Sequence, residues 1–176
     1  DLWIYQEILW ETKPDVIIEC GTFHGGSTLY YAKLFDIMDL DGEIITIDVD
    51  AMPDMPQHKR IKYLIGSSTS DEILSKVKDM IKDKKRVMVI LDSDHTCDHV
   101  YRELELYHNF VSPGQYLVVE DSNINGHPVY SGFGQGPGPW EAMEKFLPAH
   151  PEFETDKSKE KFLMSFNPNG YLKKLR

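Results

Sequence analysis

In the stretch Val87-Met88-Val89-Ile90-Leu91-Asp92-Ser93-Asp94-His95, five apolar residues are followed at once by carboxylates and a histidine. A second apolar run, Tyr116 to Val119, ends in the same way, in Glu120 and Asp121. Short apolar runs with polar boundaries are typical of buried parallel strands. Carboxylates that directly follow such strands lie at the carboxyl edge of the sheet, where open α/β sheets bind ligands. Both runs therefore predict strands whose ends contribute to one site.

The rest of the chain alternates between predicted strands and helices. The segment 96–110 has the length of one crossover helix, so the two strands that flank it are expected to be neighbours. The predicted strands are 15–19, 43–48, 61–65, 87–91, 115–119, a short one near Phe153, and 162–166. The predicted helices are 2–11, 27–38, 71–81, 96–110 and 139–147, with Ser27 and Ser70 as N-caps. This order predicts an α/β, Rossmann-like fold with a mainly parallel sheet and helices on both faces.

Composition narrows the class of protein. The 176 residues are 41% hydrophobic and carry a net charge of −10, which suits one domain and argues against nucleic acid as a partner. The two cysteines, Cys20 and Cys97, form neither a disulfide framework nor a zinc pattern, as expected in a reducing cytoplasm. No run is long enough to span a membrane, and no signal peptide is recognised. Residues 1–176 are expected to form a single domain of a longer protein, since the chain does not begin with Met.

A glycine-rich turn follows the first predicted strand, from Glu19 to Ser27. It is neither a P-loop nor G-x-G-x-x-G, so a dinucleotide site is disfavoured, whereas a nucleoside-type ligand fits. Asp48, at the end of the second strand, is placed to accept hydrogen bonds from ribose hydroxyls. Gly66-Ser67-Ser68 ends the third strand, where it can contact an adenine edge. A glycine turn after a strand can also have a purely structural role. The prediction of a nucleoside-type ligand therefore depends on the turn, Asp48 and Gly66-Ser67-Ser68 taken together.

The carboxylates after the fourth and fifth strands suggest a metal-assisted site. Clustered carboxylate oxygens suit Mg²⁺ or a similar hard cation. Alternation along an extended chain leaves open whether Asp92 or Asp94 faces the metal. A structural role is the alternative for both residues: Asp92 as the cap of the following helix, and His95 as an exposed residue of its first turn. His99 lies four residues after His95, but a zinc helix is disfavoured because no glutamate follows His95 directly.

These motifs resemble those of Rossmann-like methyltransferases that use S-adenosylmethionine. Glu19-x-Gly21-x-x-x-Gly25-x-Ser27 is similar to the first motif of that class, and Ile45-Thr46-Ile47-Asp48 to the second. A nearer resemblance is to the cephalosporin-hydroxylase-like family, whose members are similar to macrolide-sugar and rhamnosyl O-methyltransferases. That resemblance is carried by Gly25-Gly26-Ser27, Leu91-Asp92-x-Asp94-His95, Val119-Glu120-Asp121 and Gly136-Pro137-Gly138-Pro139-Trp140-Glu141.

The resemblance implies a class I methyltransferase fold with a seven-stranded sheet, and S-adenosylmethionine as methyl donor. The implied cofactor-binding residues are Glu19, Gly21, Thr22, Gly25, Ser27, Asp48, Ser68 and Asp92. Family members usually carry a further N-terminal region, which the present chain is expected to lack. The resemblance also suggests a homo-oligomer.

Metal-dependent catechol-type O-methyltransferases offer a check on spacing. In them an aspartate after the fourth strand and an acidic pair after the fifth hold Mg²⁺, and a basic residue three positions after that aspartate is the general base. Here Glu120 follows Asp92 by 28 positions, and His95 lies three after Asp92. The resemblance therefore implies Asp92, Glu120 and Asp121 as Mg²⁺ ligands and His95 as the base.

The expected function is Mg²⁺-dependent transfer of a methyl group to a hydroxyl of a sugar or glycosylated small molecule. Two alternatives stay open: the same cofactor with a catechol-type phenol or a β-lactam-type hydroxyl as acceptor, and a nucleoside-binding module without catalysis. A glycine-rich loop, 123–139, is expected to help select the acceptor.

Overall fold

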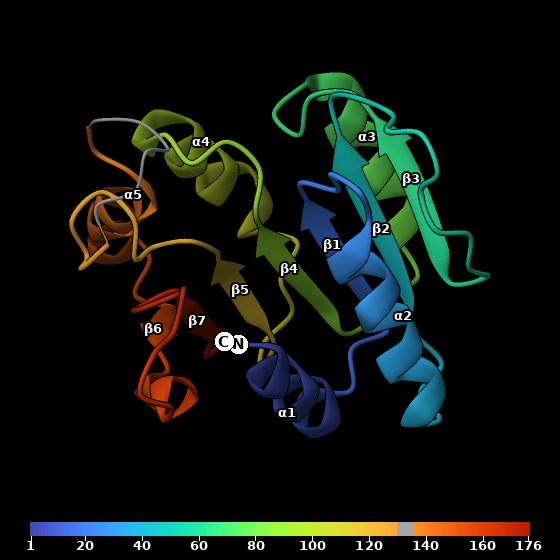
Figure 1. Cartoon of the computed structure of the whole chain (residues 1–176), viewed down its shortest axis with the longest axis horizontal. Coiled ribbons are helices and arrows are strands. Elements are labelled where there is room, and N and C mark those ends of the chain that lie inside the picture. The colour runs from blue at the N-terminus through green and yellow to red at the C-terminus, as the bar shows by residue number, and fades with distance from the viewer. Residues whose placement is uncertain (130–135) are drawn as a thin grey trace.

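The computed structural model describes residues 1–129 and 136–176, and within them seven strands form one sheet in the order β3-β2-β1-β4-β5-β7-β6 (Figure 1). The strands are β1 (Val16–Cys20), β2 (Glu43–Asp48), β3 (Ile61–Ile65), β4 (Val87–Leu91), β5 (Tyr116–Val119), β6 (Phe153–Thr155) and β7 (Tyr171–Lys174). The first five are parallel, whereas β7 runs antiparallel to both β5 and β6. The predicted neighbours β4 and β5 are indeed paired.

Helices cover both faces of the sheet, as the strand–helix alternation predicts. They are α1 (Leu2–Thr12), α2 (Gly26–Ile37), α3 (Asp71–Ile81), α4 (Cys97–Tyr107) and α5 (Pro139–Phe146), with 3₁₀ turns at Leu147–Ala149 and Lys157–Glu160. Apolar side chains of α3, α4 and α5 pack on one face, and those of α1 and α2 pack on the other. Strands buried on both sides explain the continuous apolar runs in the sequence. Among the described residues, no helix combines the length and apolar character that crossing a membrane requires.

Two local predictions are wrong. Ser27 does not cap α2: Gly25 holds that position in a left-handed conformation, with φ of 73°, and Ser27 lies inside the first turn. Residues 162–166 do not form a strand, because β7 occupies the place beside β5. Instead the Asp1 carboxylate accepts hydrogen bonds from the backbone N–H of Phe166 and the hydroxyl of Ser165, both 2.8 Å long. Ser70, in contrast, caps α3 as predicted, and its Oγ accepts from the N–H of Ile73.

Candidate active site

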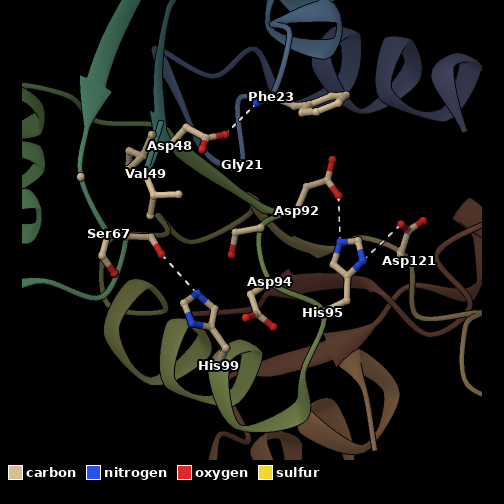
Figure 2. A pocket seen from close by; sticks show the side chains of 14 residues that line it. Gly21, Phe23, Asp48, Val49, Ser67, Asp92, Asp94, His95, His99 and Asp121 are labelled. Atoms are coloured by element: carbon tan, nitrogen blue, oxygen red, sulfur yellow. Dashed lines mark hydrogen bonds and ion pairs between the residues drawn. The ribbon is translucent and has the colours of Figure 1, made fainter. Parts of the chain in front are cut away.

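A cavity of about 680 Å³ opens at the carboxyl ends of the parallel strands (Figure 2). It lies where β1 and β4 diverge, the topological switch point of the sheet, at which open α/β folds bind ligands. The lining residues come from five strand ends and from the start of α4: Gly21, Phe23, Ile47, Asp48, Val49, Gly66, Ser67, Ser68, Asp92, Ser93, Asp94, His95, His99 and Asp121.

The floor of the cavity depends on a close approach between two strand ends. Gly21 follows β1 with a φ of 101°, and a β-carbon at this position would lie 1.8 Å from the carbonyl oxygen of Asp92. The N–H of Asp92 donates to the carbonyl of Cys20 over 2.7 Å, which holds the two strand ends together. Only glycine fits here, because any side chain would separate β1 from β4.

Asp48 shapes the glycine-rich turn from the end of β2. Its Oδ2 accepts hydrogen bonds from the backbone N–H groups of Thr22 (2.9 Å) and Phe23 (2.7 Å), and Oδ1 accepts a longer one from Asp50 (3.2 Å). In Figure 2 the carboxylate lies at the edge of the cavity, next to Val49. One carboxylate thus holds the turn and faces the space where a ligand binds.

Glu19 lies behind the turn. Its side chain is buried and accepts hydrogen bonds from three hydroxyls, those of Ser27 (2.5 Å), Thr46 (2.6 Å) and Thr28. Burial raises the pKa of Glu19, and these hydroxyl donors oppose the rise. Of the eight residues predicted to bind the cofactor, four line the cavity, namely Gly21, Asp48, Ser68 and Asp92. Glu19, Thr22, Gly25 and Ser27 instead build the turn that supports it.

Glu103 is a residue of the site region that the sequence analysis did not single out. It is fully buried on α4, and its Oε1 accepts from the hydroxyls of Ser68 (2.5 Å) and Ser93 (2.7 Å). His99 contacts the same oxygen with its Nε2 at 3.3 Å. Its position between Val100 and Leu104, on the apolar face of α4, is the sequence feature that could have identified it. A glutamate on that face is buried and needs hydrogen-bond donors.

His95 lies between two carboxylates at the edge of the cavity (Figure 2). Its Nε2 is 3.3 Å from Oδ1 of Asp92, and its Nδ1 is 3.5 Å from Oδ2 of Asp121. The three residues offer ligand atoms that all lie within 4.8 Å of one another. Asp94 has a different role: its Oδ1 accepts from the N–H of Thr96 at the start of α4 over 2.8 Å. The arrangement therefore favours Asp92 over Asp94 as the residue that faces a metal.

Glu120 is directed toward α1, where the hydroxyl of Tyr5 donates to its Oε1. Burial, and next the nearby Asp92 carboxylate, raise the pKa of Glu120 to about 7. Burial also raises the pKa of Asp121, and the hydrogen bond to Asp92 raises that of His95. The carboxylates of Asp92 and Asp121 thus share one partly buried place with the imidazole of His95, and Glu120 lies close enough for the charge of Asp92 to raise its pKa. A divalent cation would relieve this repulsion, so the residues fit a metal site.

The loop before α5 is anchored beside the cavity. Glu141 accepts from the N–H of Gly138 over 2.6 Å and contacts Nε2 of His127 at 2.7 Å. The His127 ring stacks on Trp140 with centroids 4.5 Å apart, and the carbonyl of Pro137 accepts from the N–H of Cys97. Of the predicted loop 123–139, residues 130–135 lie outside the described part of the chain.

A family model described as rhamnosyl O-methyltransferase/CmcI matches residues 1–175. The chain belongs to this family. Rhamnosyl O-methyltransferase of Mycobacterium tuberculosis (strain H37Rv) is 39% identical over 98% of the chain and 72% of its own length. The protein of the same description from Mycobacterium leprae (strain TN) is 36% identical over 98% of the chain and 76% of its own. Family membership confirms the prediction of an O-methyltransferase that uses S-adenosylmethionine.

Solved structures agree with the fold expected for the rhamnosyl O-methyltransferase/CmcI family. An apo structure of CmcI superposes with a TM-score of 0.73 at 20% identity, over 99% of this chain and 70% of that one. MycE, a methyltransferase of mycinamycin biosynthesis solved with Mg, SAH and mycinamycin VI, gives a TM-score of 0.67 at 19% identity. The match covers 98% of this chain and 48% of MycE. The predicted class I methyltransferase architecture is confirmed.

Proposed function

We propose that this chain transfers a methyl group from S-adenosylmethionine to a hydroxyl of a sugar or glycosylated small molecule, with Mg²⁺ at Asp92, Glu120 and Asp121. The observation that carries the proposal is the position of His95, between Asp92 and Asp121 at the edge of the cavity. This position supports the proposal because an imidazole and two carboxylates lie together where they line the cavity. The names of the relatives, which are rhamnosyl O-methyltransferases, support a sugar acceptor.

The cavity offers separate contacts for the parts of the methyl donor. Asp48 accepts a hydrogen bond from a ribose hydroxyl with the lone pair of Oδ1 that its three backbone hydrogen bonds leave free. Ser67 and Ser68 face the adenine, with His99 and the buried Glu103 behind them. Gly21 lets the backbone approach the amino-acid portion. These contacts leave the methyl-bearing end of the donor near Asp92 and His95.

Magnesium would supply charge that lowers the pKa of the acceptor hydroxyl and holds two neighbouring oxygens of a diol. Related structures are consistent with such a site, since a CmcI structure is described with Mg and SAM and MycE with Mg and SAH. Glu120 would turn from Tyr5 toward Asp92 to complete the ligand set. With Asp92 and Asp121 directed to the metal, one ring nitrogen of His95 would be free to take the hydroxyl proton as the oxygen attacks the methyl carbon. The bond between that carbon and the sulfonium sulfur breaks in the same step, and S-adenosylhomocysteine leaves with the electron pair.

The acceptor is bound beside the loop that Glu141 and Trp140 anchor, and we propose that this loop selects it. A sugar presents adjacent hydroxyls, which match the closely spaced carboxylates of the metal site. We also propose that the protein acts as a homo-oligomer. Acceptors of the catechol or β-lactam type would need the same metal and base, so the site alone does not distinguish them from sugars. A comparison of the rates of methyl transfer to the three classes of acceptor does.

Calorimetric titration with S-adenosylmethionine tests the binding half of the proposal. Micromolar binding is expected, and Asp48→Asn should weaken it by about 1–3 kcal/mol, because an amide can still support the turn but loses an acceptor for the ribose. Asp50→Ala, an exposed carboxylate on the same loop, is the matched control and should bind as the wild type does. If Asp48→Asn and Asp50→Ala bind S-adenosylmethionine with equal affinity, Asp48 does not contact the ribose. Failure of the folded wild-type chain to bind would contradict the cofactor site.

A further inference from the structure

A second cluster of metal-ligating side chains lies at the opposite end of α4 from the cavity. It contains His108, directly after α4, and His150 and Glu152, which precede β6. Each offers a ligand atom, and these atoms lie within 4.8 Å of one another. The eleven residues of α4 span about 16 Å. The cluster is therefore separate from the catalytic residues, which stand at the N-terminal end of the helix.

Hydrogen bonds orient both imidazoles. Nδ1 of His108 is 3.1 Å from the carbonyl oxygen of Leu104, which can only accept, so Nδ1 carries the hydrogen and Nε2 keeps a free lone pair. Nε2 of His150 lies 3.1 Å from Oε1 of Glu105 and donates a hydrogen to it, so Nδ1 is the nitrogen that can bind a metal. In proteins, histidines that bind metals are held in the same way, by a carbonyl or carboxylate on their outer nitrogen.

Packing holds the cluster in this arrangement. The ring of His150 stacks on buried Phe146, with centroids 3.9 Å apart and planes inclined by 17°. The two imidazole rings are 4.4 Å apart. The ammonium of Lys174 donates to the carbonyls of His108 (3.0 Å) and Val111 (2.9 Å), so its hydrogen bonds go to the end of α4. The ligand atoms are thus positioned by elements from both sides of the cluster.

We propose that His108, His150 and Glu152 form a second metal site, for a zinc-type divalent ion, with Glu105 orienting His150. Nδ1 of His150 is 3.2 Å from Oε1 of Glu152. Ligands of a tetrahedral zinc ion stand about 3.3 Å apart, given bonds of about 2.0 Å. In this contact a hydrogen on Nδ1 joins the two atoms, and a metal ion would take the place of that hydrogen. His108 offers the third ligand atom, within 4.8 Å of the other two. Two imidazoles with a carboxylate suit Zn²⁺ and disfavour Mg²⁺ or Ca²⁺.

Such an ion would join the end of α4 to the turn that leads into β6. β6 is the edge strand of the sheet and pairs only with β7 among the described residues, and its buried residue, Phe153, packs in the core against Phe146. The site would stabilise this edge and leave the catalytic pocket unchanged. Water would take the fourth position around the ion.

Zinc titration tests the proposal in a variant that lacks the catalytic site, Asp92→Ala, so that the two sites do not compete. After dialysis against a chelator, calorimetry is expected to show one Zn²⁺ per chain with micromolar or tighter affinity. Adding His108→Gln or Glu152→Gln should weaken binding at least tenfold, and adding Glu105→Gln should weaken it by about tenfold. Co²⁺ should give a tetrahedral visible spectrum that the two ligand variants lose.

The control is His58→Gln in the same background. His58 also pairs with a carboxylate, that of Asp36, but is not part of the cluster, so zinc binding should be unchanged. Far-UV circular dichroism establishes that each variant is folded. Two results would overturn the proposal. One is the absence of stoichiometric Zn²⁺ binding in the Asp92→Ala protein. The other is that adding His108→Gln or Glu152→Gln, in a folded variant, leaves the Zn²⁺ affinity of the Asp92→Ala protein unchanged. The contacts of His150 with Glu105 and Glu152 would then be hydrogen bonds of a purely structural role.

Discussion

Replacing Gly21 by alanine tests whether the contact between the ends of β1 and β4 builds the cavity. The new β-carbon would lie 1.8 Å from the carbonyl oxygen of Asp92, on a backbone with φ of 101°. The unfavourable φ costs about 1–2 kcal/mol. Relief of the overlap, by moving one strand end, costs about 1–3 kcal/mol more. Gly21→Ala should therefore lower the free energy of unfolding by about 2–5 kcal/mol.

Two other glycines separate these contributions. At Gly114 φ is 81°, but nothing lies within 4 Å of an added β-carbon, so Gly114→Ala measures the backbone cost alone. Gly26, on the first turn of α2, has neither a positive φ nor a neighbour within 4 Å, and Gly26→Ala should be neutral or slightly stabilising. Urea denaturation gives all three values, and calorimetry gives the affinity for S-adenosylmethionine. If Gly21→Ala costs no more than Gly114→Ala and binds the cofactor normally, the close approach does not shape the site.

Three further predictions concern other parts of the molecule. His95→Gln should lower kcat by about 10²–10⁴-fold and change the affinity for S-adenosylmethionine little, in steady-state kinetics and calorimetry, because only proton transfer is lost; an unchanged kcat would exclude His95 as the base. Glu120→Gln should weaken Mg²⁺ activation yet retain cofactor binding, and a wild-type Mg²⁺ dependence of the rate would remove Glu120 from the metal site. Burial works against ionisation of Asp15, but hydrogen bonds from Arg86 and from backbone N–H groups hold its pKa below the ordinary value, so Asp15→Asn should lose about 1 kcal/mol at pH 7. That loss should begin to shrink as the pH falls below about 4, the unfolded pKa, and should vanish once the pH is below the lowered pKa of the folded protein; a deficit that does not shrink as the pH is lowered in urea titrations would contradict the ion-pair explanation.

The central strands β1, β4 and β5 could be predicted from sequence because all their residues are buried, whereas β3, at the edge of the sheet, is only partly buried. Their apolar runs end where the chain meets solvent, as in Val87–Leu91, and so the edge that carries the site was also predictable. The segment 162–166 has similar residues but pairs with no strand in the described part of the chain. The true last strand, Tyr171–Lys174, was missed because two of its four residues are lysines, which are depleted in strands.

Side-chain roles in the site were harder to predict than their location. A glutamate near the end of a strand can face the ligand or turn inward. Only the hydrogen bonds from the hydroxyls of Thr28 and Thr46 show that Glu19, in β1, turns inward. The orientation of Glu120 likewise depends on Tyr5, 115 residues earlier. Glu103 was missed because charged residues on a helix are usually exposed. Tertiary contacts therefore decide which of several carboxylates reaches the cavity.

Transfer of a labelled methyl group from S-adenosylmethionine to a rhamnose-bearing acceptor tests the central claim most directly. The purified chain is assayed after chelation, and again after Mg²⁺ is restored, beside Asp92→Asn. We expect labelled sugar ether only when Mg²⁺ is present, with at least a hundredfold loss in Asp92→Asn. Equal transfer with and without Mg²⁺, or full activity in Asp92→Asn, would contradict a metal-assisted reaction at this site.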